Sequence, residues 1–540
     1  RWNWTTPIVI SPFNTKTLYT GANKVFKSTD RGYSWSAVSP DLTTQPTVDR
    51  GLSEAGYGNI TALSESSKRE GLIYVGTDDG NVQVTRDGGR TWTNLTSRVT
   101  GVPKMLQVTR LTPSAFDEGT VYATFDGHRS DDYKPYVYAS TDFGQSWKSI
   151  TSNLPSGSAY TIKEDPKNRS VLYLGTEFGL FVSTDRGASW TRWSAAPTVA
   201  VYDLVVHPRE NDLVLATHGR AIMVIDDISP IQQLSESVLS GQSYLFDIRD
   251  ATEFIPNESG WFVGGRDFAG PNPEFGAYLN YYLKSAVDDV RLTITDASGA
   301  VVRELTGPKD AGIHRVAWDL RTTAVGPIPL GMYMDPSYTN AGPLVLPGEY
   351  TVRLSAGRQQ STRKVRVEGD PLIQISDADR RATFQALATA TNMQSTATAA
   401  ADAITELGKQ LEQVAVTLKG YPNAPASVRT AVEAATKEVA DLRISLIGAG
   451  GRGGGGGGGG AAGVRNRING LKGDLITSQS LPTAAQTVQL DTDLKTLNAV
   501  VVQLNTTLGT TIPALFKQLA DNNVRVGFGE PIKPIKPIER

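Results

Sequence analysis

Short segments in which apolar and polar residues alternate fill the first 370 residues of the chain, and over residues 1–235 they recur in a fixed order. Each of four units ends on a near-copy of one eight-residue turn: "STDRGYSW" from Ser28, "TRDGGRTW" from Thr85, "STDFGQSW" from Ser140 and "STDRGASW" from Ser183. The spacings of 57, 55 and 43 residues between these turns fit four-stranded blades. The pattern therefore predicts a β-propeller segment.

A fifth unit, "VYDLVVHPRENDLVLATHGRAIMVIDD", keeps the strand pattern but lacks the turn. We predict a degenerate fifth blade here, because the β-branched and aromatic residues that favour strands remain. The propeller segment is then expected to have five blades.

The repeated turn has a structural explanation. Its Ser or Thr hydroxyl and its Asp carboxylate accept hydrogen bonds from nearby backbone N–H groups, and its Gly adopts the positive φ that closes the loop. The final Trp is expected to wedge between neighbouring sheets. Catalysis needs dissimilar groups that converge, whereas equivalent turns on successive blades point outward. The residues assigned to this structural role are Asp30, Gly32, Trp35, Asp87, Gly89, Trp92, Asp142, Gly144, Trp147, Asp185, Gly187 and Trp190.

Residues 236–370 begin with a connector and continue as alternating strands, including "DVRLTITD" and "GEYTVRLSAG", separated by Gly, Pro and Asp turns. This pattern predicts an immunoglobulin-like β-sandwich. The stretch "FVGGRDFAGPNPEFGAY" is expected to be a long ordered loop.

The hydrophobic period changes to that of helices after Pro371, with a 3-4 spacing of apolar residues. We predict helices at residues 376–418, 425–447, 464–479 and 482–522, forming an α-helical bundle over residues 371–526. The glycine-rich residues 448–463 are expected to be a flexible linker, and residues 527–540 an extended Pro-rich tail.

Composition excludes several classes of function. With 53 Lys and Arg against 55 Asp and Glu residues, the chain has no net field that would attract nucleic acid or an anionic membrane. It has no Cys and therefore no disulfide or thiolate metal site. No apolar run approaches the roughly 20 residues of a membrane-spanning helix, so no transmembrane segment is predicted. The absence of an initiator Met leads us to expect that a signal peptide or a longer precursor preceded Arg1.

The S/T-x-D-x-G-x-S/T-W pattern resembles the Asp box, or bacterial neuraminidase repeat, of sialidases, xyloglucanases and sortilin-type propellers. Together with "LYLGTEFGLFVSTDRGASW" and "VVHPRENDLVLATHGRAIMVIDDISPI", it is similar to a family of large exported bacterial proteins labelled sortilin-like, VPS10-like or glycosyl-hydrolase-like. The resemblance implies a secreted, periplasmic or cell-surface location and further blades upstream. It also implies a complementary propeller chain or precursor half as partner, because open sheet edges need pairing. A homo-oligomer stays open.

The turns between the second and third strands of each blade are expected to emerge opposite the repeated turns, on the usual ligand side of a propeller. The predicted ligand-face residues are Asp78, Asp79, Asp126, His128, Arg129, Asp131, Asp132, Glu177, His218 and Arg220, with Asn23, Lys24 and Tyr133 nearby.

Asp79 and Glu177 are the candidate catalytic carboxylates, because glycoside hydrolysis needs two carboxyl groups within about 10 Å. The arginine trio and the Tyr–Glu nucleophile of a sialidase cannot be assembled from these loops. No cofactor is predicted. The stretch "DGHRSDD" offers oxygen ligands for Ca²⁺ but lacks the spacing of an EF-hand, so metal content stays open.

We therefore expect a non-catalytic binding or assembly scaffold with a protein or glycan ligand. The alternative is a sialidase- or xyloglucanase-like glycoside hydrolase. A third possibility is a degraded enzyme fold that is retained as a structural subunit.

Overall fold

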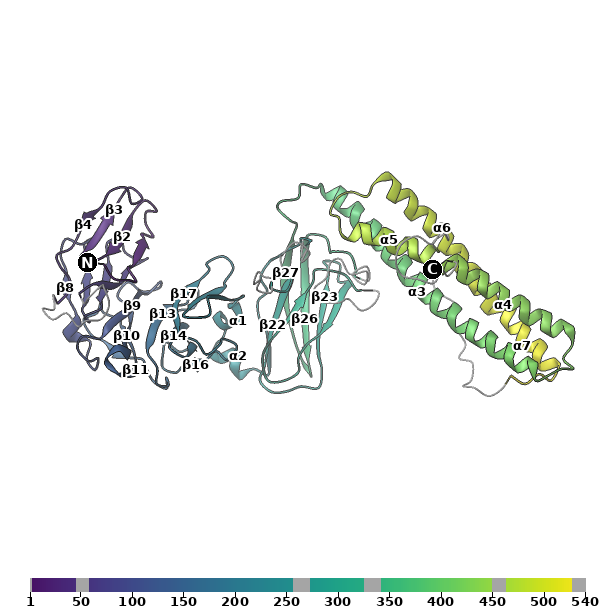
Figure 1. Ribbon diagram of the computed structural model, residues 1–540, viewed down its shortest axis with the longest axis horizontal. Helices are drawn as coiled ribbons and strands as arrows, with labels where there is room; N and C mark the ends of the chain where they lie inside the picture. The colour runs from purple at the N-terminus through teal and green to yellow at the C-terminus, as the bar shows by residue number, and fades with distance from the viewer. Residues whose placement is uncertain (1, 45–57, 256–271, 325–340, 449–462, 527–540) are drawn as a thin grey trace. The chain divides into compact units, whose positions relative to one another are not determined.

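The computed structural model describes residues 2–44, 58–255, 272–324, 341–448 and 463–526 (Figure 1). It forms two compact units, Arg1–Gln242 and Ser243–Arg540, which are described separately. Residues 449–462 of the predicted linker 448–463, the predicted tail at 527–540 and most of the predicted loop "FVGGRDFAGPNPEFGAY" lie outside the described residues.

The first unit consists of five antiparallel sheets, one for each unit of the sequence (Figure 1). Blade 1 consists of β1 (Ile8–Ile10), β2 (Leu18–Gly21), β3 (Val25–Ser28) and β4 (Ser36–Ala37). Blade 2 consists of β5 (Ile60–Glu65), β6 (Ile73–Thr77), β7 (Val82–Thr85) and β8 (Thr93–Asn94). Blade 3 is β9 (Gln107–Pro113), β10 (Val121–Gly127), β11 (Asp132–Ser140), β12 (Lys148–Ser149), and blade 4 is β13 (Ala159–Glu164), β14 (Leu172–Thr176), β15 (Gly179–Ser183), β16 (Thr191–Arg192). Blade 5 has three strands, β17 (Val201–Val206), β18 (Leu213–Thr217) and β19 (Ile222–Ile225).

Each repeated turn joins the third and fourth strands of its blade and is closed by its own side chains. In the first turn, Ser28 Oγ accepts from the Gly32 N–H at 2.8 Å, and Asp30 accepts from the N–H and hydroxyl of Ser34 at 2.9 and 2.6 Å. These hydrogen bonds, led by the Ser34 hydroxyl, lower the pKa of Asp30 to about 2. The turn glycines have φ values of 83° to 98°, which favours glycine over residues with a Cβ.

The turns also join neighbouring blades. Trp190 is 4% exposed and donates through Nε1 to the Ile150 carbonyl of blade 3 at 2.7 Å, and Trp92 donates to the Val38 carbonyl of blade 1 at 3.1 Å. Ile150 and Val38 each lie three residues after the Trp of the preceding turn. We call this contact the blade joint. In the described part of the chain no blade precedes blade 1, and Trp35 is 42% exposed.

A short helix replaces the turn at the last joint. Trp193 of blade 4 packs against buried Ile228, which leads into α1 (Ser229–Gln232). Gln232 holds this helix in place, because its carbonyl accepts from Asn168 at 2.8 Å and its amide donates to Asp165 at 2.9 Å. A second short helix, α2 (Glu236–Ser240), follows. The chain therefore leaves the propeller at blade 5.

The second unit begins with a two-sheet sandwich. One sheet has the order β20 (Ser243–Leu245), β22 (Ala277–Leu283), β25 (Gly312–Trp318). The other has the order β21 (Ala251–Thr252), β27 (Gln359–Glu368), β26 (Gly348–Ala356), β23 (Val290–Thr295), β24 (Val301–Thr306). Its core includes Leu279 and Trp318 of the first sheet and Leu292 and Val352 of the second. Alternating inward residues on both sheets produce this core, as the sequence pattern predicts.

The helical part follows the predicted order. It comprises α3 (Asp377–Lys419), α4 (Ala426–Ile447), α5 (Val464–Ile476), α6 (Ala484–Thr506), the π-turn η4 (Thr507–Thr511) and α7 (Ile512–Asp521). The apolar stripes meet in one core that includes Leu407, Leu411, Val501 and Leu504. Two predictions need correction: the third helix ends at Ile476, and the fourth is interrupted by η4. Pro513 lacks an N–H, which accounts for this change in the hydrogen-bond pattern.

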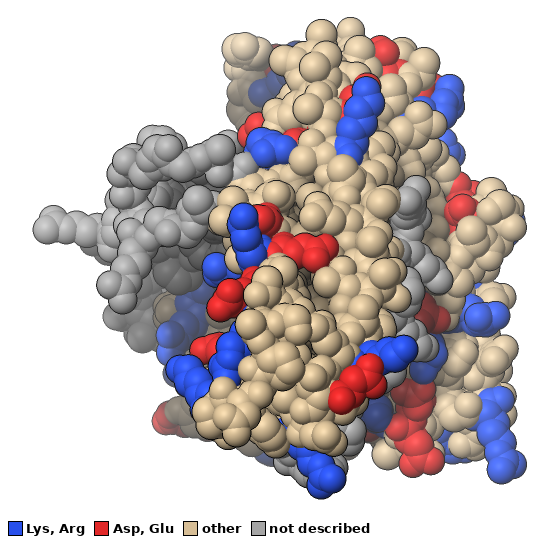
Figure 2. Space-filling model, turned by 90° about the vertical axis from the view of Figure 1, so that its right-hand side faces the viewer, with Lys and Arg blue, Asp and Glu red and all other residues tan. Residues whose placement is uncertain are grey.

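One helical stretch of the described residues, Ala484–Asp521, is long and apolar enough to cross a membrane by length and composition alone. Its apolar stripe, which includes Leu497, Leu515 and Leu519, packs into the bundle core. Other apolar side chains of the stretch, Val488 and Val502, are 65% and 42% exposed. On the face shown in Figure 2, basic and acidic side chains are interspersed, in line with the near balance of charges in the sequence.

Lys472 of α5 is fully buried, and its Nζ donates to Gln394 Oε1 of α3 at 2.8 Å. Burial, aided by the charge of Arg321, lowers the pKa of Lys472 to about 7. Between pH 7 and about 10 the unfolded chain therefore holds a proton here that the folded chain lacks. The free energy of unfolding should rise with pH over this range, by up to about 1.4 kcal/mol per pH unit.

We expect Lys472→Met to remove this dependence, since Met fills a similar volume without a charge. The free energy of unfolding of the variant should exceed that of the wild type most at pH 7 and below, and this difference should shrink toward pH 10. Urea unfolding of both proteins at pH 6, 8 and 10 measures it. An equal gain at all three values would contradict the assignment.

Candidate functional site

The first strands of blades 2 to 5 each carry a β-bulge at the same place. Pairing skips one residue between Ile60 and Ala62, between Val108 and Arg110, between Ala159 and Thr161, and between Val201 and Asp203. The skipped residues, which we call the bulge residues, are Thr61, Thr109, Tyr160 and Tyr202. Bulges re-aim side chains and are common next to active sites. These four lie at the strand ends nearest the turns between second and third strands.

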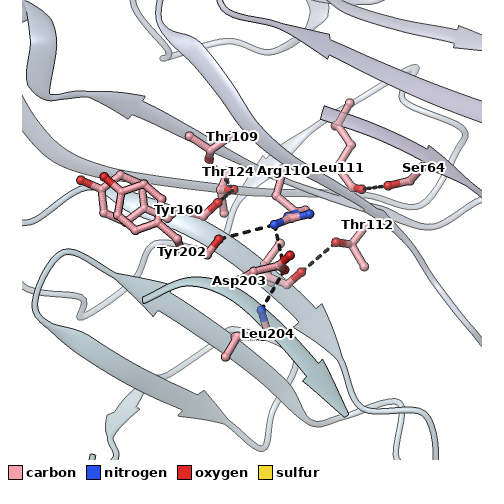
Figure 3. A network of polar contacts seen from close by, with 11 residues as sticks. Ser64, Thr109, Arg110, Leu111, Thr112, Thr124, Tyr160, Tyr202, Asp203 and Leu204 are labelled. Carbon is pink, nitrogen blue, oxygen red and sulfur yellow. Dashed lines mark hydrogen bonds and ion pairs between the residues drawn. The ribbon is translucent and has the colours of Figure 1, made fainter. Parts of the chain in front are cut away.

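The two threonines join blades, whereas the two tyrosines form an aromatic pair. Thr61 Oγ1 donates to the Val108 carbonyl at 2.8 Å and Thr109 Oγ1 to the Ala159 carbonyl at 3.0 Å, each in the next blade. The rings of Tyr160 and Tyr202 are stacked, with centroids 4.3 Å apart and planes 15° apart (Figure 3). Tyr202 is 43% exposed, so part of its ring is accessible to a ligand.

Acidic and imidazole groups surround this aromatic pair. The Tyr160 hydroxyl donates to the Glu177 carboxylate, and the His218 ring lies 5.5 Å from the Tyr202 ring. Burial raises the pKa of Tyr160, and the bond to Glu177 and the charge of Asp126 raise it further. Of the predicted ligand-face residues, the structure therefore gathers Asp126, Glu177 and His218 around Tyr160 and Tyr202.

A polar network lies beside the aromatic pair (Figure 3). Arg110 Nη2 of β9 contacts Asp203 Oδ1 of β17 at 2.8 Å and donates to the Tyr202 carbonyl at 3.4 Å. Asp203 Oδ1 also accepts from the Leu204 N–H at 2.8 Å. Burial, with the nearby Arg110 charge, lowers the pKa of Lys163 on β13.

Asp78 and Asp79 have enclosed positions. Asp78 accepts from the N–H groups of Gly58 and Asn59 at 2.8 and 2.9 Å, and burial raises its pKa. Asp79 is 2% exposed and accepts from Thr77 Oγ1 and, at 2.8 and 2.6 Å, from the N–H and hydroxyl of Thr44. These carboxylates hold loop backbone in place, and Asp79 has no open side for a substrate.

The longer loop of blade 3 is held by its own carboxylates. Asp126 accepts from the His128 N–H at 3.0 Å and contacts His128 Nδ1 at 2.5 Å, and Asp132 accepts from the Tyr136 hydroxyl at 2.6 Å. The remaining predicted ligand-face residues, Arg129, Asp131 and Arg220, are exposed. Across the described ranges, no three His, Asp or Glu side chains form a group that could hold a metal ion.

Sequence reasoning missed Tyr160 and Tyr202. Inspection of turns alone cannot find them, because both lie on first strands. The signal was available, since alignment of the blades places Thr61, Thr109, Tyr160 and Tyr202 at one repeat position. The Tyr160–Glu177 contact also supplies a Tyr–Glu pair that the loops alone did not reveal.

Comparisons with known proteins support the fold of both β parts. Residues 135–242 match the family "Sortilin, neurotensin receptor 3", and residues 274–334 match the FlgD Ig-like domain. The sortilin-like resemblance and the predicted fold class are thus confirmed. A xyloglucanase of Hypocrea jecorina is 29% identical over an alignment of 238 positions that covers 37% of this chain and 27% of that enzyme. The chain therefore spans about a quarter of this curated relative.

Two solved structures are also similar. The GH74 xyloglucanase of Xanthomonas campestris is 15% identical over 66% of this chain and 57% of its own, with a TM-score of 0.35. YCF48 of Cyanidioschyzon merolae is 12% identical over 39% of this chain and 65% of its own, with a TM-score of 0.29. The assignment of blades rests on the strand order of the sheets described above.

Proposed function

We propose that this protein is a non-catalytic binding and assembly scaffold at the bacterial cell surface or in the periplasm. Blades 3 to 5 would bind a ligand at the bulge residues, and blade 1 would bind further propeller blades. The observation that carries the assembly role is the exposure of Trp35 at 42%, against 4% for the equivalent Trp190.

The blade joint supports this role because blade 1 presents only one half of it. Trp92 Nε1 reaches the Val38 carbonyl of the blade before it, whereas Trp35 Nε1 donates to Gly32 and Trp147 Nε1 to Gly144, each within its own turn at 3.0 Å. Trp35 is therefore distinguished by its exposure of 42% and not by its hydrogen bond. Ile8 and Ile10 of β1 are also 71% and 61% exposed. Such apolar area on an edge strand favours a partner. The expected partner is a complementary propeller segment, on a separate chain or in one precursor.

Trp35→Ala tests the assembly role. We expect the variant to keep the thermal stability of the purified chain within about 2 °C, because an exposed side chain contributes little. Native mass spectrometry of protein isolated from its source should show wild-type chain in equal amounts with a segment rich in the repeated turn. The amount of that complex recovered with the variant should be at least about tenfold lower, because aromatic residues at the centre of an interface contribute most of its binding energy.

Tyr33→Ala is the matched control, since Tyr33 belongs to the same turn and is 90% exposed. It should assemble like the wild type. Isolation of the wild-type chain alone, or full assembly of Trp35→Ala, would refute the assembly role.

A glycoside hydrolase is the second candidate, favoured by the convergence of Asp126 and Glu177 on Tyr160 and by the similarity to a xyloglucanase. It predicts release of reducing ends from xyloglucan by the wild-type chain and a loss of at least about 100-fold in Glu177→Gln. Glu118→Gln, a change on a half-exposed Glu that pairs with Arg69, is the control. Xyloglucan left intact by the wild type favours the scaffold.

A further inference from the structure

The inner wall of blades 3 to 5 carries charged side chains just below the aromatic pair. Arg110 pairs across β10 with Thr124, two positions from the end of the ladder at Asp126. Asp203 pairs with Ala216, next to the bulge at Tyr202, and Lys163 lies deeper, opposite Tyr173. Three first strands, β9, β13 and β17, thus carry Arg110, Lys163 and Asp203, and Figure 3 shows Arg110 and Asp203 in contact.

One N–H group of the Arg110 guanidinium has no acceptor among the described residues. Its Nη2 is engaged by Asp203 Oδ1 and the Tyr202 carbonyl, but its Nε is buried and has no hydrogen-bond partner among the described residues. A buried donor without an acceptor is costly, and most such groups in folded proteins are satisfied. The Nε–H and an Nη–H of one guanidinium form the fork that binds a carboxylate through two hydrogen bonds. The unsatisfied Nε therefore points to an acceptor that comes from outside the chain.

The charges around Arg110 are of both signs. Burial and the charge of Arg110 lower the pKa of Lys163, whereas Asp203, which contacts Arg110 at 2.8 Å, and Glu164 raise it. The neighbouring Glu164 is used elsewhere, as it accepts from Ser114 Oγ, the Ala115 N–H and the Tyr122 hydroxyl at 2.7 to 3.0 Å. The Asp203 side chain is half exposed, at 50%, so a competing carboxylate can reach its place.

Exposed aromatic rings lie at the end of the blades that carries the turns between second and third strands. Tyr202 is 43% exposed above Arg110, and Phe178 and Tyr133 of the adjoining loops are 49% and 55% exposed. Phe178 and Tyr133 are neighbours, because Gly157 donates to the Tyr133 carbonyl at 2.7 Å and its Cβ position faces the Phe178 ring. Flat exposed rings offer stacking area at a small cost in side-chain entropy. The wall thus combines a carboxylate fork with stacking surfaces.

We propose that Arg110 and Lys163 bind the carboxylate of an acidic polysaccharide, a chain of uronic-acid sugars, while Tyr202 stacks on the sugar ring. The ligand carboxylate accepts from Arg110 Nε and takes over the contact now made by Asp203. Asp203 is then a competitor that holds the site in the free protein. This inference deepens the proposed binding role and rests on it.

The test measures binding of two soluble probes to the full chain by calorimetry: an oligogalacturonate and a neutral xyloglucan oligosaccharide. We expect the oligogalacturonate to bind at least about tenfold more tightly, and its affinity to fall as salt is raised. Arg110→Gln should lower the affinity for the oligogalacturonate at least about tenfold, and Lys163→Met should lower it by a smaller factor. Asp203→Asn should raise this affinity, because the amide oxygen still accepts from the Leu204 N–H but the side chain no longer competes as an anion.

Arg129→Gln is the matched control, since Arg129 is an exposed cation on the same face, and it should change affinity less than about twofold. Unchanged binding in Arg110→Gln, or equal affinity for both probes, would overturn the proposal. Equal affinity for polyglutamate would assign the site to acidic peptides and overturn it too. If Arg110→Gln fails to fold, Lys163→Met and Asp203→Asn decide. Trp35→Ala should retain binding, so loss of assembly and loss of this site are distinguishable.

Discussion

Trp190→Ala is expected to lower the free energy of unfolding of the propeller unit by about 3 to 5 kcal/mol, the usual cost of removing a large buried aromatic side chain. Trp190 is 4% exposed and packs between blades 3 and 4, against Ile150 and Phe181. Its indole N–H also satisfies the Ile150 carbonyl, which the substitution leaves without that donor. Urea unfolding monitored by circular dichroism measures the loss.

The same substitution in the other repeated turns provides a graded control. Trp92 is half-buried and should show an intermediate loss, while Trp35, which is 42% exposed, should lose less than about 1 kcal/mol in the isolated chain. This order follows from the neighbouring blade rather than from the turn sequence, which is nearly identical. Equal losses at all three positions would mean that the turn's own closure determines stability, and that the blade joint does not.

Gly76→Ala and Gly175→Ala should separate neighbouring blades. Both glycines lie on second strands, where the first strand of the next blade comes close. An added Cβ at Gly76 would lie 2.4 Å from Val108 Cγ1, and at Gly175 it would lie 2.5 Å from the Val201 carbonyl oxygen. We expect Gly76→Ala to cost about 1 to 3 kcal/mol and Gly175→Ala to cost more, because a backbone atom cannot rotate away.

A second substitution distinguishes the two clashes. Val108→Ala removes the Cγ1 that lies 2.4 Å from the new Cβ at position 76 but keeps the Val108 Cβ at 2.6 Å, so the rescue is partial: Gly76→Ala/Val108→Ala should lose less stability than the sum of the single variants and more than Val108→Ala alone. Trimming Val201 should not rescue Gly175→Ala, since its carbonyl remains. Additive losses at positions 76 and 108 would contradict the close approach of blades 2 and 3.

The fold could be predicted because its signals are local and repeated. The turn sequence alone indicates hydrogen bonds from nearby backbone N–H groups, and Ser28 and Asp30 accept them from Gly32 and Ser34. The alternation at Leu292 and Ile294 and the 3-4 spacing at Leu407 and Leu411 likewise specify the buried faces. The π-turn at Thr507–Thr511 was not predicted, because apolar spacing does not reveal how hydrogen bonds rearrange around Pro513.

The candidate site was only partly predictable, because it depends on contacts between blades. Strand order placed Glu177 and His218 on the ligand face, but nothing local distinguishes Glu177 from Asp79. The difference lies in partners from distant segments: Thr44 encloses Asp79, whereas Glu177 meets the hydroxyl of Tyr160. Arg110 was overlooked for the same reason, since its partner Asp203 lies two blades further along the chain.

The four bulges have a consequence for how such a protein diversifies. A residue skipped by strand pairing faces few demands from the ladder, so the same position holds Thr in blades 2 and 3 and Tyr in blades 4 and 5 while each strand keeps its register. Thr61 and Thr109 join blades through their hydroxyls and Tyr160 is buried, whereas Tyr202 is 43% exposed. Variation at position 202 should therefore alter ligand preference with the least effect on folding, which makes it the first position to randomise in directed evolution.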